Sequence, residues 1–531
     1  MPEVHRIAYH PPGISGPYIL DYNTHEQLTQ VFYPSNHRRI SYFYNQHGLP
    51  SRTIFDWTDV HRSYDPSTLK LDRAVVENRG PQSYSCTLSY GGAGEALVTS
   101  HSVACSSDNL EFMSAEFVYE YDSHFRLVSL EAIFDKRPSV SQLFNYSVET
   151  GRLIGVSSFR FDYPSLYREV ISDKNVQVTD ELDKFSRLSD ERYSFNDYIV
   201  FSKEVNYDGL GRIYQWRRKI GLSDLKAYEY VYDIDGNVVE VLINSQVSWK
   251  YEIDANGNIV KITHHSSVQN IVINQQNQIE SSGQLSYVVD RDGFVVQRDR
   301  EVFEYSALGV LVRAFKSDVF DVRFYYDSEN RLVATSDAEN SPHLQFFYAD
   351  LRISERVTHF YDHSTHKMTE LFYSGRGRLF AMRQDEKYYY ICLDPQGSPI
   401  LILNAMGSVV KQLTYDPLGG QISDSAPEFS FPFGFRFGIF DPTTKLVLLG
   451  GRAYDPRVGR WMMPDYRRFV ENVGEFTSFP EMANLYQNLN LNPRYLASGQ
   501  LMSGKKTTPT YANLEFIHSL LFISYICIDN K

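Results

Sequence analysis

The chain has 531 residues, too many for one ordinary compact core, so the fold must divide into domains or repeat a smaller unit. Aromatic residues make up 15% of the chain, with 39 Tyr and 34 Phe, and this composition favours β-structure. The net charge of −13 argues against a surface that binds nucleic acid. The four cysteines (Cys86, Cys105, Cys392, Cys527) never have Cys-x-x-Cys spacing, which excludes a disulfide-dense scaffold and a thiolate zinc site.

The amino terminus, MPEVHRIAYHPPG, has no basic segment followed by an apolar one, so it shows no signal peptide. The only long apolar run is residues 516–528, which is shorter than the roughly 20 residues of a membrane-spanning helix. We expect a buried or divergent tail there, and we expect both ends to belong to a longer protein.

A short unit recurs over most of the chain. It consists of an aromatic residue, any residue, tyrosine, aspartate, two or three residues, glycine, arginine or asparagine, and an aliphatic residue. Clear copies are VNYDGLGRI (205–213), YVYDIDGNV (230–238), YEIDANGNI (251–259), YVVDRDGFV (287–295), FEYSALGVL (303–311) and FYYDSENRL (324–332). The aspartate or its equivalent recurs every 16 to 25 residues, and each step fits one β-hairpin.

Each unit predicts a strand followed by a tight turn. Alternation places two rings on one face of the strand. The aspartate can bond to its own backbone, and the glycine supplies a positive φ, as in a type I turn followed by a glycine bulge. The turn residues expected in this role are Asp208, Gly211, Asp233, Gly236, Asp254, Gly257, Asp290 and Gly293. We therefore predict an all-β fold, a wound shell of hairpins with no long helix.

The aromatic rows have two interpretations. They can form platforms on which carbohydrates or nucleic-acid bases stack, or they can form the core between neighbouring hairpins. We favour the core, because rings that recur in register at every hairpin are mostly buried in folded proteins.

The repeats resemble the YD repeats of the Rhs family, which occur in bacterial Rhs and Tc toxin subunits and in animal teneurins. The segment RAYDPRVGRWMMPD (452–465) is similar to the Rhs-associated core that closes such shells. Teneurins match best, in HLQFFYADL (343–351), FDPTTKLVLLG (440–450) and ANLYQNLNLNP (483–493), which stand in teneurin order. The resemblance covers about residues 5–495, whereas 501–531 departs from it.

This resemblance implies a division of the chain. Residues 1–425 would form the YD-repeat β-shell, 426–466 the core that closes it, 467–500 an internal linker or plug, and 501–531 a divergent apolar tail. It further implies part of a single-pass protein on the extracellular side of the plasma membrane, active in cell adhesion, signalling and neuron development. The implied partners are proteins, either a second teneurin or a latrophilin-type adhesion receptor, with no cofactor and no nucleic acid.

The resemblance also raises one enzymatic hypothesis, because Rhs and Tc relatives cleave themselves after the core through aspartates. Asp441, Asp455 and Asp465 are the candidates. The relatives carry Asp-Pro-x-Gly-Leu at the cleavage point, whereas Tyr-Arg-Arg follows Asp465 here. We interpret the three aspartates as relics, interpret the Asp394-Pro and Asp416-Pro segments as ordinary repeat turns, and expect no enzyme.

Metal sites are not expected. The turns at Asp233, Asp254 and Asp290 resemble the start of a calcium loop but lack its later ligands. The side chains of His359, His363 and His366 could approach one another around a hairpin loop, without an acidic or thiolate pattern nearby. The run Arg217-Arg218-Lys219 is interpreted as a solvated rim.

Two modifications are candidates. Cys86 and Cys105 flank the loop Gly91-Gly92-Ala93-Gly94 and either pair across it or remain buried thiols. Asn145-Tyr146-Ser147 is the one glycosylation sequon, so Asn145 is a glycosylation candidate in a secreted chain.

Two further function classes remain as alternatives to an adhesion scaffold. The first is a shell that encapsulates a C-terminal polypeptide, as in the toxin relatives. The second is a carbohydrate-binding module, which would require exposed aromatic rows.

Overall fold

A computed structural model describes residues 5–10, 16–92, 94–107, 110, 112–135, 139–222, 224–337, 342–464 and 486. Within this part of the chain a sheet of 39 strands and a sheet of 4 strands make up almost the whole fold. The only helix among these residues is one 3-10 turn, η1 (Phe435–Phe437). The all-β shell predicted from the sequence is confirmed.

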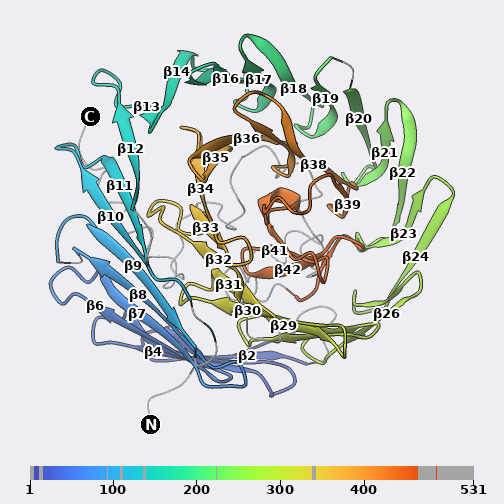
Figure 1. The fold of residues 1–531 in the computed structure, drawn as a ribbon. Helices are drawn as coiled ribbons and strands as arrows, with labels where there is room; N and C mark the ends of the chain where they lie inside the picture. Colours follow the sequence, from blue (N-terminus) through green and yellow to red (C-terminus); the bar gives the residue numbers. More distant parts are fainter. Residues whose placement is uncertain are drawn as a thin grey trace.

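The long sheet winds into a spiral, seen along its axis in Figure 1. The first winding consists of β1 (His5–Tyr9), β2 (Tyr18–Tyr22), β3 (Leu28–Phe32), β4 (Arg39–Tyr44), β5 (Pro50–Phe55), β6 (Thr58–Tyr64), β7 (Leu71–Asn78), β8 (Tyr84–Gly91), β9 (Ser100–Ser106), β10 (Ala115–Tyr121), β11 (Leu127–Phe134), β12 (Val140–Tyr146), β13 (Leu153–Val156), β14 (Phe159–Ser165), β15 (Arg168–Asp173), β16 (Val176–Leu182), β17 (Leu188–Phe195), β18 (Tyr198–Tyr207), β19 (Ile213–Ile220), β20 (Asp224–Tyr232), β21 (Val238–Ile243), β22 (Gln246–Ile253), β23 (Ile259–His264), β24 (Ser267–Ile273) and β25 (Ile279–Ser282).

The second winding follows without a break. It consists of β26 (Leu285–Val289), β27 (Val295–Arg298), β28 (Glu301–Tyr305), β29 (Leu311–Lys316), β30 (Phe320–Tyr326), β31 (Leu332–Ser336), β32 (Pro342–Phe347), β33 (His359–Asp362), β34 (Lys367–Tyr373), β35 (Leu379–Gln384), β36 (Lys387–Leu393), β37 (Pro399–Asn404), β38 (Val409–Tyr415) and β39 (Gln421–Asp424). The closing segment, residues 426–464, carries η1 and the small sheet of β40 (Ile439–Phe440), β41 (Val447–Leu449), β42 (Arg452–Asp455) and β43 (Arg460–Trp461).

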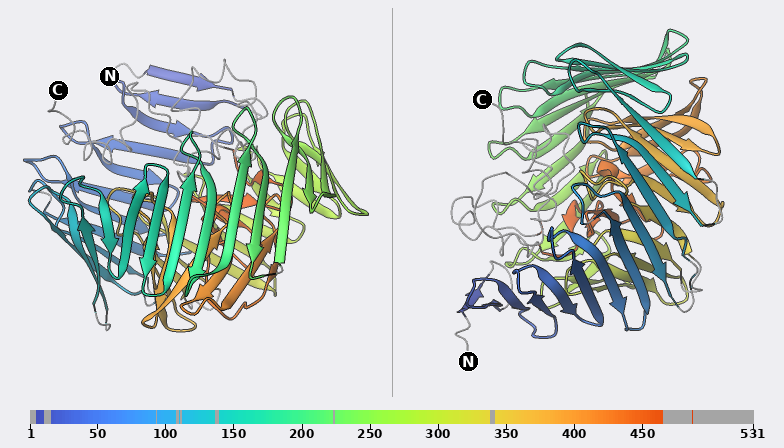
Figure 2. Two further views of the ribbon diagram at one scale, coloured as in Figure 1. Left: turned by 90° about the horizontal axis from the view of Figure 1, so that it is seen from above. Right: turned by 90° about the vertical axis from the view of Figure 1, so that its left-hand side faces the viewer.

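Every strand of the long sheet pairs antiparallel with the next strand in the chain, from β1 to β39. The strands stand side by side around the spiral in Figure 2, and β33–β42 lie inside the ring formed by the first winding in Figure 1. An unbroken meander of this kind follows from tight turns that recur every one or two strands.

The repeat turns have the geometry of a type I turn followed by a glycine bulge. At the β18–β19 turn, Gly211 has φ +84° and its N–H donates to Asp208 O at 3.0 Å. The Asp208 Oδ1 atom accepts hydrogen bonds from the N–H groups of Leu210 and Arg212, both at 2.9 Å. The ladder then shifts register by one residue at Tyr207. The turns at Asp233, Asp254 and Asp290 have the same N–H to C=O bond from Gly236, Gly257 and Gly293, each with a positive φ.

At several of the turns an arginine links the turn to the next repeat. Asp183 Oδ2 accepts a hydrogen bond from Arg187 Nε at 2.8 Å, and the guanidinium carbon lies 4.0 Å from the centroid of the Tyr207 ring. The Tyr207 hydroxyl in turn donates to Leu188 O at 2.9 Å. The same chain of contacts recurs, with its members in the order Asp, Arg and Tyr, at 122, 126 and 146, at 208, 212 and 232, at 327, 331 and 348, and at 350, 356 and 373. In these repeats tyrosine, aspartate and arginine therefore act together to join one hairpin to the next.

Other tyrosine hydroxyls join the two windings. Tyr18 donates to Asp292 O at 3.3 Å, Tyr84 to Tyr326 O at 3.0 Å, Tyr119 to Ala349 O at 2.9 Å and Tyr193 to Ile391 O at 2.7 Å. The separation along the chain falls from 274 residues in the first pair to 198 in the last. The second winding is thus shorter than the first, which is why it passes inside it in Figure 1.

The rings form the core, which confirms the core interpretation of the aromatic rows. Between the windings, Phe159 lies 4.9 Å from Phe380 and 5.2 Å from Phe372 in edge-to-face contacts, and all three are buried. Such pairs contribute about 0.5–1.5 kcal/mol beyond their buried area.

A first prediction concerns the tyrosine hydroxyl. The change Tyr207→Phe keeps the ring beneath Arg187 but removes the hydrogen bond to Leu188 O, so we expect the free energy of unfolding to fall by about 1 kcal/mol. Chemical denaturation followed by tryptophan fluorescence measures it. Tyr198→Phe is the matched control, because Tyr198 is 79% exposed and its change should leave the midpoint unmoved. Equal midpoints for Tyr207→Phe and the parent chain would contradict this role of the hydroxyl.

Candidate functional site

One buried carboxylate fastens the closing segment to the second winding. Asp455 ends β42 and is fully buried. Its Oδ2 atom accepts hydrogen bonds from Arg298 Nη1 at 2.7 Å and from Tyr287 OH at 3.3 Å. Arg298 also donates to Thr444 O at 2.7 Å and pairs with Glu301 at 2.6 Å. Burial opposes the charge of Arg298, but the two carboxylates raise its pKa above the ordinary value.

The other candidate aspartates lie elsewhere. Asp441 caps the β40–β41 turn, where its Oδ2 accepts a hydrogen bond from Thr444 N–H at 3.0 Å. Asp465 lies outside the described residues. Within residues 342–464, no hydrogen bond joins the carboxyl groups of Asp441 and Asp455. The self-cleavage hypothesis therefore gains no facing pair of carboxyl groups in this part of the chain.

Asp416, which the sequence pattern places only in a repeat turn, has a raised pKa. Burial raises its pKa to about 7, although the N–H groups of Leu418 and Gly420 donate to it at 2.8 and 2.9 Å. The charge of Asp455 acts in the same direction as burial. The pattern Asp-Pro-Leu-Gly-Gly does not predict this raised pKa, because the closing segment packs on the turn. Tyr454 OH of that segment donates to Leu418 O at 2.8 Å.

The acidic turns are already occupied by partners from the chain. Asp290 and Asp292 both bind Arg38 Nη1, at 2.8 and 2.7 Å. Asp254 Oδ1 accepts hydrogen bonds from the N–H groups of Asn256 and Asn258 at 2.9 Å. Among the described residues, no group of three or more His, Cys, Asp or Glu side chains is placed to hold a metal ion.

The three histidines of the β33–β34 hairpin point in different directions. His359 is buried between the rings of Phe117 and Phe134, at 5.7 and 5.5 Å, and this burial lowers its pKa to about 3. His366 Nδ1 lies 3.3 Å from a tyrosine hydroxyl, and His363 Nε2 lies 3.4 Å from a glutamine oxygen. The hairpin does not bring the three rings together around one point.

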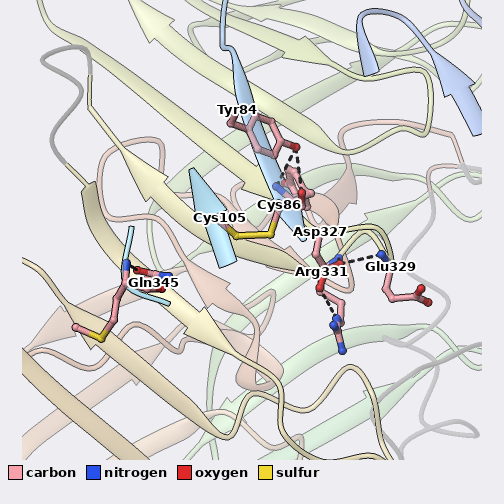
Figure 3. The surroundings of a disulfide bond; sticks show 9 residues. Tyr84, Cys86, Cys105, Asp327, Glu329, Arg331 and Gln345 are labelled. Atoms are coloured by element: carbon pink, nitrogen blue, oxygen red, sulfur yellow. Dashed lines mark hydrogen bonds and ion pairs between the residues drawn. A yellow bond between two sulfur atoms is a disulfide. The ribbon is translucent and has the colours of Figure 1, made fainter. Parts of the chain in front are cut away.

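Cys86 and Cys105 are directly opposite each other on β8 and β9, and a disulfide joins them. Figure 3 shows this bond beside the Asp327–Arg331 turn of the second winding, next to the hydrogen bond from Tyr84. Cys392 is buried without a disulfide, and burial raises its pKa. Cys527 lies outside the described residues.

The sequon lies on the outer face of the shell. Asn145 is exposed near the end of β12, and its cross-strand neighbour is Gly155, which has no side chain to cover it. A surface hollow of about 560 Å³ adjoins it, lined among others by Tyr146, Ile154 and Phe159. The amide of Asn145 therefore has open space on the outside of the shell.

Known proteins share the sequence pattern and the fold of this chain. A family model described as Teneurin YD-shell matches residues 3–494. The chain belongs to the teneurin YD-shell family. Human Teneurin-4 is 31% identical over 494 residues, which cover 92% of this chain and 17% of that protein. Teneurin-m of Drosophila melanogaster is 28% identical over 492 residues, which cover 92% of this chain and 18% of that protein.

The chain thus spans less than a fifth of these teneurins. Among solved structures, the crystal structure of TcdB2-TccC3-TEV matches with a TM-score of 0.57 at 14% identity, over 94% of this chain and 31% of that one. The Tc holotoxin pore of Photorhabdus luminescens matches with a TM-score of 0.53 at 13% identity, over 93% of this chain and 31% of that one. At these identities the likeness concerns the fold alone.

The division of the chain expected from the teneurin resemblance stays a prediction. The long sheet ends at Asp424 and the small sheet follows it. Of residues 467–531, the structure describes Tyr486, which is buried and donates its hydroxyl to Gly293 O at 2.9 Å. The rest of the expected plug and the tail lie outside the described residues. No described helix is long and apolar enough to cross a membrane.

A second prediction tests the fastening of the closing segment. The change Asp455→Asn leaves the buried Arg298 without its fully buried counter-charge, so we expect a loss of about 3–5 kcal/mol in stability, measured by thermal unfolding. Asp441→Asn is the control, because that side chain only caps a turn near the surface, and it should cost less than about 1 kcal/mol. If both variants melt together with the parent chain, Asp455 does not hold the segment.

Proposed function

We propose that this chain is a rigid, non-enzymatic scaffold within an extracellular adhesion and signalling protein of developing neurons. Another part of the parent protein would anchor it in the plasma membrane. Its partners are proteins, either a second copy of the teneurin or a latrophilin-type adhesion receptor. The family match over residues 3–494 supports this proposal, since that match covers the whole wound sheet and its closing segment.

The proposal rests on the contacts that the chain makes inside its own shell. The second winding and the closing sheet lie within the spiral in Figure 1, and side chains such as Arg378 and Arg460 bind Asp180 and Asn258 of the first winding. The described inner face is therefore engaged in contacts within the chain. The outer face is charged and open, with cross-strand pairs such as Lys250 with Glu240 and Lys261 with Glu252, both at 2.7 Å. A partner protein would meet this outer face.

The alternative is an encapsulating shell, as in the Tc toxin proteins that share the fold. An encapsulating shell needs free space for its cargo. Here the chain's own strands β33–β42 lie inside the ring of the first winding in Figure 1, which favours the scaffold.

The experiment displays the full chain on non-adherent cells through a heterologous membrane anchor. These cells are mixed with cells that display the same chain, and separately with cells that display a latrophilin-type receptor ectodomain. We expect aggregation in at least one mixture. Protease resistance of the displayed chain verifies that it is folded, and folded chains that aggregate with neither partner would refute the proposal.

Glycan shielding then tests the outer face. Lys261→Asn and Gln177→Asn each create a sequon with the threonine two residues later, on outward positions of β23 and β16. We expect at least one of these glycans to abolish the aggregation, because a glycan excludes a protein partner from its surroundings. Lys261→Gln and Gln177→Ser, which add no glycan, should aggregate like the parent chain. Aggregation that survives both shields would place the contact away from these strands.

We also propose that Asn145 carries an N-linked glycan when the protein is secreted. Its exposure and the glycine beside it support this, since the transferring enzyme and the sugar both need open space. The expected result is a loss of mass when the secreted chain is treated with peptide N-glycosidase, and no such loss for Asn145→Gln. A secreted chain whose mass does not change would refute the assignment.

A further inference from the structure

Six charged side chains cross the inner face of the first winding in a single row, one from each of six neighbouring strands. The pairing of the strands places each directly opposite the next, in the order Glu169, Asp180, Glu191, Lys203, Arg218 and Lys226. We name these six residues the charge row. The first five are at most 4% exposed. The row contains three acids followed by three bases.

This order is costly for the first winding alone. Like charges directly opposite each other on neighbouring strands repel, and buried charges lose their hydration. Within the row, Glu191 has one base beside it, Lys203, with which it forms an ion pair. Asp180 has an acid on each side. A buried acid in that position needs a counter-charge from another part of the chain.

The second winding supplies it from the β34–β35 turn. Arg378 donates through Nη2 to Asp180 Oδ1 at 2.5 Å and through Nη1 to Glu191 Oε1. Gly375 N–H donates to Glu169 Oε1 at 3.1 Å, and Arg376 Nε lies 3.9 Å from the other oxygen of that carboxylate. Groups of this one turn thus contact all three acids.

The β36–β37 turn of the second winding contacts Lys203, the first base of the row. Lys203 Nζ donates to Leu393 O at 2.7 Å, at the start of the β36–β37 turn. The buried carboxyl group of Asp394 in that turn interacts electrostatically with Lys203. Arg218 lies 3.7 Å from Asp224 of its own winding. The run Arg217-Arg218-Lys219 is a solvated rim only in part: Arg217 and Lys219 are exposed, whereas strand alternation points Arg218 inward, where it is buried.

We propose that the charge row is a seat that fixes the register of the second winding inside the first, and that Arg378 is the residue it selects. Apart from β25 and β26, where the chain passes from the first winding into the second, no described strand of one winding pairs with a strand of the other, so backbone hydrogen bonds do not set this register. A slip by one hairpin in one direction would move Asp394 toward the three acids, and a slip in the other direction would move Arg378 toward the three bases. The charges oppose both placements, which makes the correct seating distinct. The inference is independent of the adhesion proposal.

The seat has a pH dependence that follows from Asp180. Burial raises the pKa of Asp180 to about 7, and Glu191 and Glu169 add to this while Arg378 and Lys203 oppose it. The pKa of Glu191 is instead lowered, since Arg378 and Lys203 outweigh its burial. The other titratable or charged groups around these acids are Tyr163, Tyr193, Arg376 and Cys392.

The sign of the effect is fixed by the folded and unfolded pKa values of Asp180. The folded value, about 7, lies above the ordinary 3.8, so the folded chain favours the protonated carboxyl group. The stabilisation is complete below about pH 4 and is lost as the pH rises through 7. Asp180→Asn imitates the protonated form and should abolish this loss.

Hydrogen exchange of the full chain, followed by mass spectrometry, tests the seat. In Arg378→Met we expect the amides of β34–β36 to exchange roughly tenfold faster or more, since the acids lose their counter-charge. Amides of β26–β30, which contact the first winding elsewhere, should be unchanged. Arg376→Met is the control, because its guanidinium lies farther from any acid of the row, and its effect should be small.

Two further variants make the result decisive. Arg378→Met combined with Asp180→Asn removes one charge of each sign and should recover most of the protection of β34–β36; equal exchange in the single and double variants would overturn the proposal. Asp180→Asn alone should melt higher than the parent chain at pH 8 and together with it at pH 4, whereas Asp197→Asn on an exposed turn should change neither. Asp180→Asn melting lower at pH 8 would overturn the pH dependence; if Arg378→Met fails to fold, a double variant that also fails to fold would overturn the seat.

Discussion

A tyrosine hydroxyl that donates to a main-chain carbonyl of a neighbouring repeat is the contact on which this shell depends. Within one winding, Tyr207 binds the carbonyl of Leu188, close to where the β16–β17 ladder shifts register and leaves a main-chain group without a strand partner. Between windings, Tyr84 and Tyr193 bind the carbonyls of Tyr326 and Ile391. The same side chain also buries its ring, so it fills the core and satisfies a backbone group together. Phenylalanine provides only the ring.

These contacts let a single meander form two layers whose strands pair with each other only where the chain passes from β25 to β26. The windings are joined by side chains alone, and each such contact is local to one hairpin. Rings and hydroxyls recur at every repeat, so they only weakly determine which hairpin of one winding lies against which hairpin of the other. Charged groups that do not recur, such as Arg378 opposite Asp180 and Arg298 opposite Asp455, distinguish one hairpin from the next. Buried ion pairs contribute little net stability but strongly penalise wrong pairings.

Features that depend on residues close in the sequence can be predicted from it, and features that depend on distant residues cannot. Turn chemistry and ring alternation are local, so the hairpins, the turn glycines such as Gly211 and the burial of the rings can be predicted. The burial of Asp416 and the partner of Asp180 depend on residues tens to about two hundred positions away. A repeat unit of about 20 residues carries no information on which unit of the next winding it will face. The pairing of Cys86 with Cys105 lies between these cases, since the hairpin is predictable but its register is not.

The same argument constrains where a teneurin shell of this kind can interact with partners. The side chains that point inward in the described windings are used to hold the next layer, and altering them changes the fold before it changes a surface. Outward positions such as Lys261 and Gln177 alternate with those buried positions along the same strands. They can change without affecting the layers within, because the pleat separates the two faces. A wound sheet can therefore keep its inner contacts constant while its outer face diverges, and surface specificity on such a scaffold belongs to the outward positions of its strands.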